Sequence, residues 1–563
     1  MKETVLAKVK RDPFDKLILR AQQGRRMPRA IDLRRRGVRR LSGVGGVLGD
    51  TYYVDATGGD DAKSGSAPNT AWQTIAKVNA SAFKPGDQIL FKRGETWRGE
   101  NLVVPSSGAA DRPITFGAYG SGPNPLIDPS VEYNDFTLDA GSVWKRTHAG
   151  VDLYQVFQDG ARMIYSATRA AMVQGSFAYE GGVVYVWCSD NGNPNTGHVI
   201  DYCTSQLGVA VKFNGKSHLI FDSLDVKKPN YTAYNTDLGG SSNIVVRSCE
   251  VSWAGIRSVL IGVDISGVRH DPTDVTVSNC VGHDDLDLSF WIGRGTRLIV
   301  EDCETYNSGL DLSPRAKNYP AATHFANGIL ISGDAVDCIV RDNYVHDTYE
   351  NAGIMDELSV GLHSSGCIIE RNLVDTVVSG VIGISVAGIN TTVRNNIVLH
   401  AAGKGVEFVN TPTSPLFYHN TLVNSTGSGR SIDGVTGTGI AIKNNIVVRQ
   451  GVTERFVSIV AAAGTGCVID SNEYFQINGT PRWFWGPTAE HTSFAAWQGN
   501  PGDPDTNGLS SDPVFVAPYT DLHLQTTSPC KNAGVDVGVT NDYDGRARPM
   551  GAAVDIGAYE FVE

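Results

Sequence analysis

Charged residues and long apolar runs are both scarce in this sequence. Asp, Glu, Lys and Arg make up 19% of the 563 residues and 41% are hydrophobic, which fits a packed globular protein and excludes a disordered chain. No run approaches the roughly 18 consecutive apolar residues of a transmembrane helix, so we expect no membrane insertion. The nine cysteines are odd in number and include no Cys-x-x-Cys pair, so neither a zinc site nor a disulfide framework is expected.

The net charge of −12 is unevenly distributed along the chain. Residues 1–50 contain 14 Lys and Arg against 5 Asp and Glu, and the remainder contains 34 against 55. Binding nucleic acid requires a basic surface that neutralises phosphates, so the acidic body argues against nucleic acid as a partner. The basic head, residues 1–50, needs a separate explanation.

The basic head does not resemble a good secretory signal. A signal peptide places about 7 to 15 apolar residues and a small-residue cleavage site after its charged start. Here the Arg cluster between Arg34 and Arg40 is followed only by the short, Gly-rich stretch 41–49, which is also a poor twin-arginine export signal. We therefore interpret the head as an anchor that docks into an acidic partner by charge and helix packing.

One short phrase recurs between about residues 217 and 475: β-branched residues, a polar pair, an Asn, then more apolar residues. From the second copy on, the Asn residues are 29, 24, 24, 25 and 27 positions apart. The copies centre on Asn279, Asn343, Asn372, Asn396, Asn420, Asn445 and Asn472. A period near 25 with Gly and Asn turns is typical of a β-solenoid, in which stacked coils bury one another's apolar faces. We predict that these Asn side chains stack and hydrogen-bond to the coils above and below.

The cysteines follow the same register. Cys338, Cys367 and Cys467 each lie five residues before one of these Asn residues, and Cys249 and Cys303 occupy the Asn position itself. Small buried side chains stacked along the coil axis account for this register better than metal ligation or a reactive thiol does.

Phrases at both ends of the chain carry a family resemblance. Tyr52-Tyr53-Val54-Asp55-Ala56, Trp72-Gln73-Thr74-Ile75 and Lys84-Pro85-Gly86-Asp87 resemble the entry strand, capping helix and first coil of the pectate-lyase-like superfamily, and Asp555-Ile556-Gly557 lies in a segment that resembles its C-terminal closing segment. Over about residues 51–563, the resemblance implies an all-β fold, a single-stranded right-handed parallel β-helix. It does not identify a reaction, because lyases, hydrolases and non-enzymatic binders share this solenoid.

The pattern predicts five segments. Residues 1–50 form the head, with helical potential, and residues 51–141 form the N-terminal cap and first coils. Residues 142–205 break the repeat and predict antiparallel hairpins, as a small β subdomain laid on the solenoid. Residues 206–475 are the regular coils. Residues 476–563 form an aromatic, Pro- and Gly-rich closing segment, which should cover the last coil because an open β edge invites aggregation.

Candidate site residues gather where the coil spacing is too long, since extra residues in a solenoid emerge as loops on the binding face. The predicted catalytic residues are Asp284, Asp285, Asp356, Glu357 and His324. The predicted substrate-binding residues are Trp291, Arg315, Tyr319, Tyr349 and Glu407. Trp253 and the other aromatic residues could stack on sugar rings or pack between loops. Each acid has the alternative of solvating a loop or capping a turn.

Two chemistries fit this inventory. Glycoside hydrolysis needs two carboxyl groups, whereas a lyase needs a base and cations, or Ca²⁺, to neutralise a uronate carboxylate. Carboxylates outnumber cations in this region, which slightly favours hydrolysis; no cofactor or metal is predicted, with Ca²⁺ reserved for the lyase case. The polygalacturonase branch uses Asn-Thr-Asp, Asp-Asp and Gly-His-Gly motifs. Asn235-Thr236-Asp237 and Asp284-Asp285 occur at the wrong distance and Gly-His-Gly is missing, so we do not predict that activity.

Three functions remain open. The first is a phage tailspike or virion fibre, a homotrimer in the virion tail that binds and depolymerises bacterial surface polysaccharide and attaches through residues 1–50 to a virion adaptor or baseplate protein. The second is a secreted bacterial polysaccharide lyase or glycoside hydrolase. The third is a non-catalytic β-helix adhesin.

Overall fold

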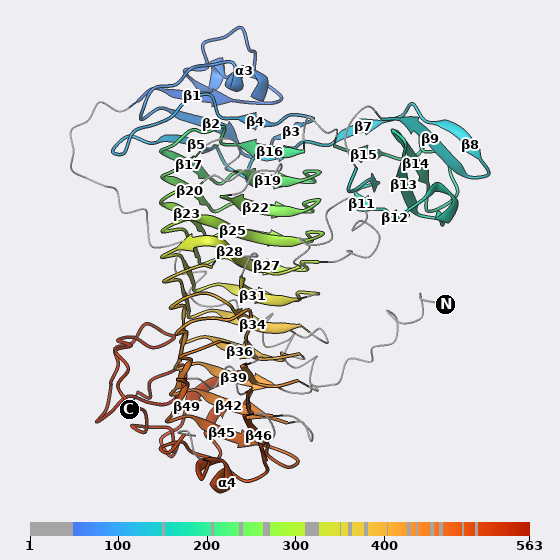
Figure 1. The fold of residues 1–563 in the computed structure, drawn as a ribbon. Helices are drawn as coiled ribbons and strands as arrows, with labels where there is room; N and C mark the ends of the chain where they lie inside the picture. Colours follow the sequence, from blue (N-terminus) through green and yellow to red (C-terminus); the bar gives the residue numbers. More distant parts are fainter. Residues whose placement is uncertain are drawn as a thin grey trace.

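The computed structural model describes residues 49–148, 153–203, 208–235, 240–262, 271–309, 326–349, 351–357, 363–376, 381–401, 403–424, 429–434, 437–450, 455–460, 466–486, 489–500 and 505–562. These residues form a long column of stacked coils, with a small β subdomain on one flank near the N-terminal end (Figure 1). The basic head, apart from its last two residues, lies outside the described residues.

Each regular coil contributes one strand to each of three parallel sheets, here called A, B and C. Sheet A contains β1 (Thr51–Val54), β2 (Gln88–Lys92), β5 (Ile114–Tyr119), β17 (Leu219–Asp222), β20 (Ile244–Arg247), β23 (Val275–Ser278), β26 (Ile299–Glu301), β29 (Ile339–Arg341), β32 (Ile368–Glu370), β35 (Thr392–Arg394), β38 (Leu416–Tyr418), β41 (Ala441–Lys443) and β44 (Val468–Asp470). Sheet B contains β3 (Thr96–Arg98), β6 (Leu126–Asp128), β18 (Asp225–Lys227), β21 (Glu250–Ser252), β24 (Val281–His283), β27 (Glu304–Tyr306), β30 (Tyr344–His346), β33 (Leu373–Asp375), β36 (Ile397–Leu399), β39 (Thr421–Asn424), β42 (Ile446–Arg449) and β45 (Glu473–Gln476). Sheet C contains β4 (Leu102–Val103), β16 (Val209–Lys212), β19 (Thr232–Asn235), β22 (Arg257–Ile261), β25 (Leu288–Thr296), β28 (Ile329–Val336), β31 (Ala352–Glu357), β34 (Ile382–Val386), β37 (Val406–Phe408), β40 (Ile432–Gly434), β43 (Val457–Ile459), β46 (Trp483–Trp485) and, antiparallel at its end, β47 (Ala489–His491).

The sequence forms these strands because every second residue is apolar and points into the coil. In β29, Val340 is fully buried while the flanking Ile339 and Arg341 are half-buried. Parallel pairing stacks Val340 on Val300 of the coil before and on Ile369 of the coil after. The result is one continuous apolar core along the column, as expected when no coil can bury its own inner face.

The predicted asparagine ladder is confirmed from Asn343 to Asn472. The Asn343 backbone N–H donates to Asn372 Oδ1 at 3.1 Å, and Asn343 Nδ2 donates to the same oxygen at 2.9 Å. Each later Asn repeats the pattern, and Asp505 accepts from Asn472 Nδ2 at 3.0 Å at the end of the ladder. In each of these coils the next Asn side chain thus accepts a hydrogen bond from a buried backbone N–H.

One predicted ladder copy was wrong by a single position. Asn279 has φ 50° and occupies the left-handed turn position, while the next residue, Cys280, is buried in the ladder column. The assignments of Cys249 and Cys303 to that column agree with the structure, and the Cys303 N–H donates to Asn343 Oδ1 at 3.0 Å. Asn is favoured at a left-handed φ, so the residue type alone did not separate a turn from a ladder.

Both ends of the column are covered. At the N-terminal end, the helix α3 (Ile75–Asn79) buries Ile75 and Val78 in the core, preceded by the 3₁₀ turn η1 (Pro68–Thr70). At the other end, α4 (Phe494–Gln498) buries Trp497 against Trp483 of the last coil. The remaining closing segment, with β48 (Phe515–Ala517) and β49 (Asp521–Leu524), packs on the outer face of the last strands of sheet B.

The β subdomain consists of two small, mainly antiparallel sheets. Its first strand is β7 (Val131–Tyr133), which lies before the predicted start at residue 142. One contains β8 (Thr137–Ala140), β9 (Val143–Thr147), β12 (Ile164–Tyr165), β13 (Ser176–Glu180) and β14 (Val183–Trp187); the other contains β7 (Val131–Tyr133), β10 (Phe157–Gln158), β11 (Ala161–Arg162) and β15 (Ile200–Tyr202), and the turn η2 (Arg169–Ala171) lies between β12 and β13. A buried ion pair joins the subdomain to the solenoid: Lys228 Nζ lies 2.8 and 2.9 Å from the two oxygens of Asp201.

No helix in the described part of the chain is long and apolar enough to cross a membrane.

Candidate functional site

The turn from sheet B to sheet C, here called the B–C corner, places one residue of each of several coils in a left-handed backbone conformation. Backbone bonds between coils hold the row in register; for example, the Trp253 N–H donates to His283 O at 3.0 Å. The row members have φ values between 48° and 63°: Lys228, Trp253, Asp284, Asn307, Asp347 and His400. Asp and Asn adopt this conformation readily, which explains three of the six residues without reference to function.

Trp253 is the bulkiest residue in this row. A bulky side chain at φ 63° costs roughly 1–2 kcal/mol relative to Gly. Its indole is only partly buried, with the Phe157 ring 5.4 Å away and the Arg162 guanidinium 5.1 Å from the ring centroid. Lys228 adopts the same backbone conformation in a structural ion pair, so the conformation of Trp253 follows from the corner, and its partly buried ring is the feature that can serve a binding site.

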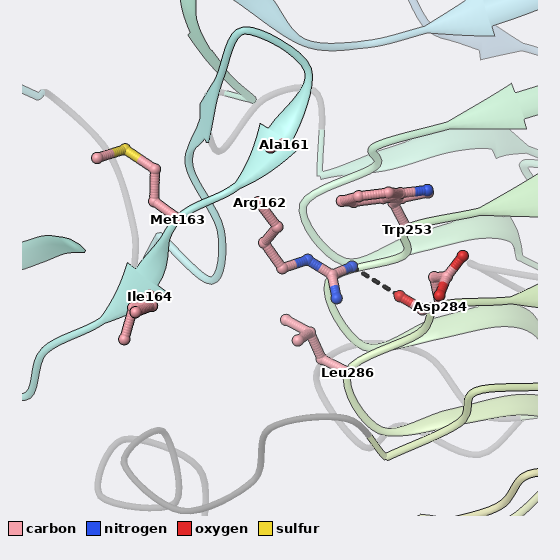
Figure 2. Close-up of a pocket in the computed structure, with 7 residues that line it drawn as sticks. All are labelled: Ala161, Arg162, Met163, Ile164, Trp253, Asp284 and Leu286. Carbon is pink, nitrogen blue, oxygen red and sulfur yellow. Dashed lines mark hydrogen bonds between the residues drawn. The ribbon is translucent and has the colours of Figure 1, made fainter. Parts of the chain in front are cut away.

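A pocket of about 390 Å³ opens between the β subdomain and the corner at Trp253 (Figure 2). Arg162 Nη2 reaches from β11 to the Asp284 carbonyl oxygen at 2.7 Å, and Arg162 Nε donates to Gln155 Oε1 at 3.2 Å. The pocket is lined by Ala161, Arg162, Met163, Ile164, Trp253, Asp284 and Leu286. An aromatic wall, aliphatic side chains and a few oriented polar groups form the lining expected of a small-ligand site.

Asp284 faces Arg162 with its backbone carbonyl oxygen, and its ionised carboxylate, on the side away from Arg162 in Figure 2, is oriented by other partners. His283 Nδ1 lies 2.7 Å from Asp284 Oδ2, and Asn307 Nδ2 donates to Asp284 Oδ1 at 3.0 Å. Burial by itself raises the pKa of Asp284, but the bonds from His283 and Asn307 outweigh it and the pKa is lowered. The carboxylate can therefore act as a base or nucleophile at neutral pH.

Tyr349 and Asp347 extend the site along the corner by two coils. Tyr349 is 40% exposed, and its pKa is raised by burial, then by the negative charges of Asp347 and Asp284. Its ring thus lies within electrostatic reach of both carboxylates. The side chain of Asp347 is 46% exposed and lies 2.8 Å from His346 Nδ1. The structure brings the predicted residues Asp284 and Tyr349 together here.

Trp291 and Glu407 lie elsewhere, on the outer face of sheet C. They share one outward row, in which Trp291 pairs with Leu330 and Glu407 pairs with Ser385. Trp291 Nε1 donates to the Ser332 hydroxyl, and Arg257 lies 4.0 Å over the indole centroid. Their predicted sugar-binding role stays a prediction.

Glu407 is nearly buried and its charge is compensated. Lys404 forms ion pairs with Glu407 and, at 2.9 Å, with Asp433 on the next strand. Arg430 contacts the other Asp433 oxygen at 2.8 Å. This cluster satisfies its own charges, so we do not include it in the corner site.

Two predicted catalytic acids are reassigned to structural roles because their carboxylates are fully buried. Asp285 accepts from Ser258 Oγ at 2.6 Å and from the Ala254 N–H at 3.0 Å, and burial raises its pKa to about 7. Asp356 points into the coil, where Thr391 Oγ1 donates to it at 2.6 Å. A carboxylate that does not reach solvent cannot contact a glycan.

The side chains of four other predicted residues lie outside the described part of the chain. His324, Arg315 and Tyr319 lie outside the described residues. The backbone of Glu357 ends β31, opposite Ser332, but its side chain is outside the described part. Their predicted roles stay predictions.

Arg162, His283 and His346 contribute to this site but are not among the residues predicted from the sequence. The two histidines had a signal, since a His-Asp dipeptide occurs both at 283–284 and at 346–347. Arg162 had none, because it contacts Asp284 across 122 residues.

Within the described ranges, no three His, Cys, Asp or Glu side chains converge as a metal site would require. All nine cysteines are buried, and no disulfide joins them. The prediction of Ca²⁺ in the lyase case stays untested.

Comparisons with known proteins agree with the fold. Residues 208–447 match the family model described as a right handed beta helix region. The solved complex of XylC with xylose superposes on 91% of this chain and 98% of its own, with a TM-score of 0.58 and 13% identity. The chain therefore has the right-handed parallel β-helix fold, as predicted.

Two lacto-N-biosidases are also similar to this chain. A GH136 lacto-N-biosidase from Eubacterium ramulus matches 76% of this chain and 68% of its own at 15% identity, with a TM-score of 0.46. The lacto-N-biosidase of Bifidobacterium longum subsp. longum is 43% identical over 75 residues, which are 13% of this chain and 5% of that enzyme. The chain thus aligns with only a small part of this curated relative.

Proposed function

We propose that this protein binds a glycan at the B–C corner and hydrolyses a glycosidic bond there. The observation that carries the proposal is the ionised Asp284 carboxylate, oriented by two hydrogen bonds beside the aromatic wall of an open pocket. The local sequence match to a lacto-N-biosidase and the fold shared with a xylose-binding protein support a glycan as the ligand.

Hydrolysis requires a second carboxyl group, for which we propose Asp347. Asp284 and Asp347 occupy the same corner position two coils apart, roughly 9 to 10 Å at the usual strand spacing. Inverting glycosidases place their two carboxyl groups about 6.5 to 9.5 Å apart, leaving room for a water molecule. In this scheme the Asp284 carboxylate removes a proton from the attacking water, and the Asp347 carboxylate passes to the leaving oxygen the proton that it takes from His346 Nδ1.

The test is a cleavage panel of xylo-oligosaccharides, glycans ending in lacto-N-biose and bacterial surface polysaccharides. New reducing ends indicate hydrolysis, an ultraviolet-absorbing unsaturated product indicates a lyase, and binding without cleavage indicates an adhesin. Asp284→Asn and Asp347→Asn should each lower kcat by at least about 100-fold, with Asp433→Asn as a control outside the site. A first product with retained anomeric configuration would contradict the Asp284–Asp347 pairing.

The tailspike hypothesis remains a second proposal, motivated by the basic composition of residues 1–50. It requires a homotrimer, virion localisation, and a virion adaptor or baseplate partner for residues 1–50. Light scattering on the full chain should then give three times the chain mass. A monomer would favour a secreted hydrolase.

A further inference from the structure

The site contains one arrangement twice. In the first copy, the His283 ring lies between two carboxylates: its Nδ1 is 2.7 Å from Asp284 and its Nε2 is 3.3 Å from Glu250 on the preceding coil. In the second copy, two coils further along, His346 Nδ1 is 2.8 Å from Asp347 and Nε2 is 3.2 Å from Glu304 on the preceding coil. The two units therefore share the same sequence order and the same geometry.

This geometry requires a charged imidazole. A neutral imidazole donates through one nitrogen only, and the other nitrogen would point its lone pair at a carboxylate. With a carboxylate at both nitrogens, both must carry hydrogen. Burial lowers the pKa of His283 and of His346, but the bonds to the flanking carboxylates outweigh this and raise the pKa of each to about 9.

The coil between the two units joins them. Tyr306 stacks on His283 with a centroid distance of 4.6 Å and an interplanar angle of 8°, and on His346 with 5.2 Å and 15°. Tyr344 covers His346 at 4.2 Å. The rings form one stack along the outer face of sheet B, which restricts the rotation of both imidazoles.

The other charged groups near His283 are accounted for. The buried Asp285 acts on it through charge, and Arg162 acts on its partner Asp284. The net surroundings of the ring are anionic. An imidazolium here fixes the rotamer of the adjacent Asp and keeps that Asp ionised.

We propose that His283 and His346 are positioning residues, which as imidazolium ions hold the Asp284 and Asp347 carboxylates at the B–C corner in their working orientation. The proposal rests on the proposed function, because it assigns the two histidines a role in that reaction. It adds two residues that do not themselves touch the reacting bond.

The chain offers a matched control. His523, in the closing segment, lies between Asp521 at 2.6 Å and Asp544 at 3.0 Å and packs on Tyr559 at 3.9 Å. It has the same carboxylate–imidazole–carboxylate arrangement in β49, at the other end of the column from the coils of Asp284 and Asp347 (Figure 1). His523→Gln therefore reproduces the structural loss without touching the site.

The kinetic test compares His283→Gln, His346→Gln and His523→Gln on a cleaved glycan. We expect kcat to fall roughly 10- to 100-fold for the first two, with KM changed less than about threefold, and no change for His523→Gln. Equal kcat and pH profiles in all three variants would overturn the proposal.

Glu250→Gln, an exposed change that should not impair folding, gives an independent test. It removes one of the two carboxylates, so the high-pH limb of the kcat profile should move to lower pH while kcat at neutral pH is kept. An unmoved limb counts against the proposal.

A titration without substrate separates this inference from the proposed function. The imidazole Cε1–H resonances of His283 and His346, assigned through the Gln variants, should titrate near pH 9. If they titrate near the ordinary value of about 6.5, the inference fails even when the protein cleaves a glycan. If they titrate near pH 9 and no glycan of the panel is cleaved, the proposed function fails and the charged pairs stand.

Discussion

Replacing Asn396, in the middle of the asparagine ladder, is the sharpest test of the architecture. Asn396 Nδ2 donates to Ile369 O and Asn420 Oδ1, both at 2.9 Å, and to Arg394 O at 3.1 Å. Asn396 Oδ1 accepts from Asn372 N and Nδ2, both at 3.0 Å. All of these bonds except the part-buried one to Arg394 O are buried, so water does not replace most of the bonds that Asn396→Ala removes.

The cost follows from the groups left behind. The Asn372 N–H and the Ile369 carbonyl lose their side-chain partner, and each buried unsatisfied group costs about 1–3 kcal/mol. With the weakened contacts of Asn420 and Arg394, we expect Asn396→Ala to lower the free energy of unfolding by about 4 kcal/mol. Because a solenoid couples nearest neighbours, hydrogen exchange should accelerate mainly in the coils on either side.

The assay is urea unfolding with Asn390→Ala as the control. Asn390 is exposed, with φ 53°, so its replacement removes only a conformational preference worth about 1 kcal/mol. If Asn396→Ala cost no more than the control, the ladder would not be the stabilising element inferred here.

Three further predictions concern the site and its support. The pKa of His283 and of His346 is raised to about 9 in the folded protein, so each contributes stability that is fully present below pH 6.5 and is lost as pH rises through 9. We expect this contribution to be on the order of 2 to 3 kcal/mol per residue. A free energy of unfolding that does not change with pH above 6.5 would refute this. Lys228→Met should cost about 3 kcal/mol because it leaves Asp201 buried without its ammonium partner, and adding Asp201→Asn should restore part of that in a double-mutant cycle. The Trp253→Gly variant should be about 1 kcal/mol more stable than Trp253→Ala, because only Gly relieves the left-handed backbone. Both variants should bind glycan more weakly, as measured by calorimetry. The opposite order of stability would show that the backbone is unstrained.

The coil period, the core and the stacking of the ladder are determined by the sequence. A strand with one buried residue in the middle, as in Ile339-Val340-Arg341, can be predicted from the sequence because side chains alternate across a strand. A repeat near 25 residues leaves few other ways to bury those apolar residues. The error at Asn279 arose because Asn serves equally well in a left-handed turn and in a ladder.

The composition of the site was decided only by the tertiary structure. Asp284 and Asp285 are adjacent and identical in type, yet the corner turns one carboxylate outward beside His283 and buries the other against Ser258. Arg162 reaches the same corner from a subdomain inserted between the first coils and the regular ones. A pattern of residue types carries the periodicity of a chain, but the direction of a side chain at a corner depends on the backbone conformation of that single residue and on what folds back against it.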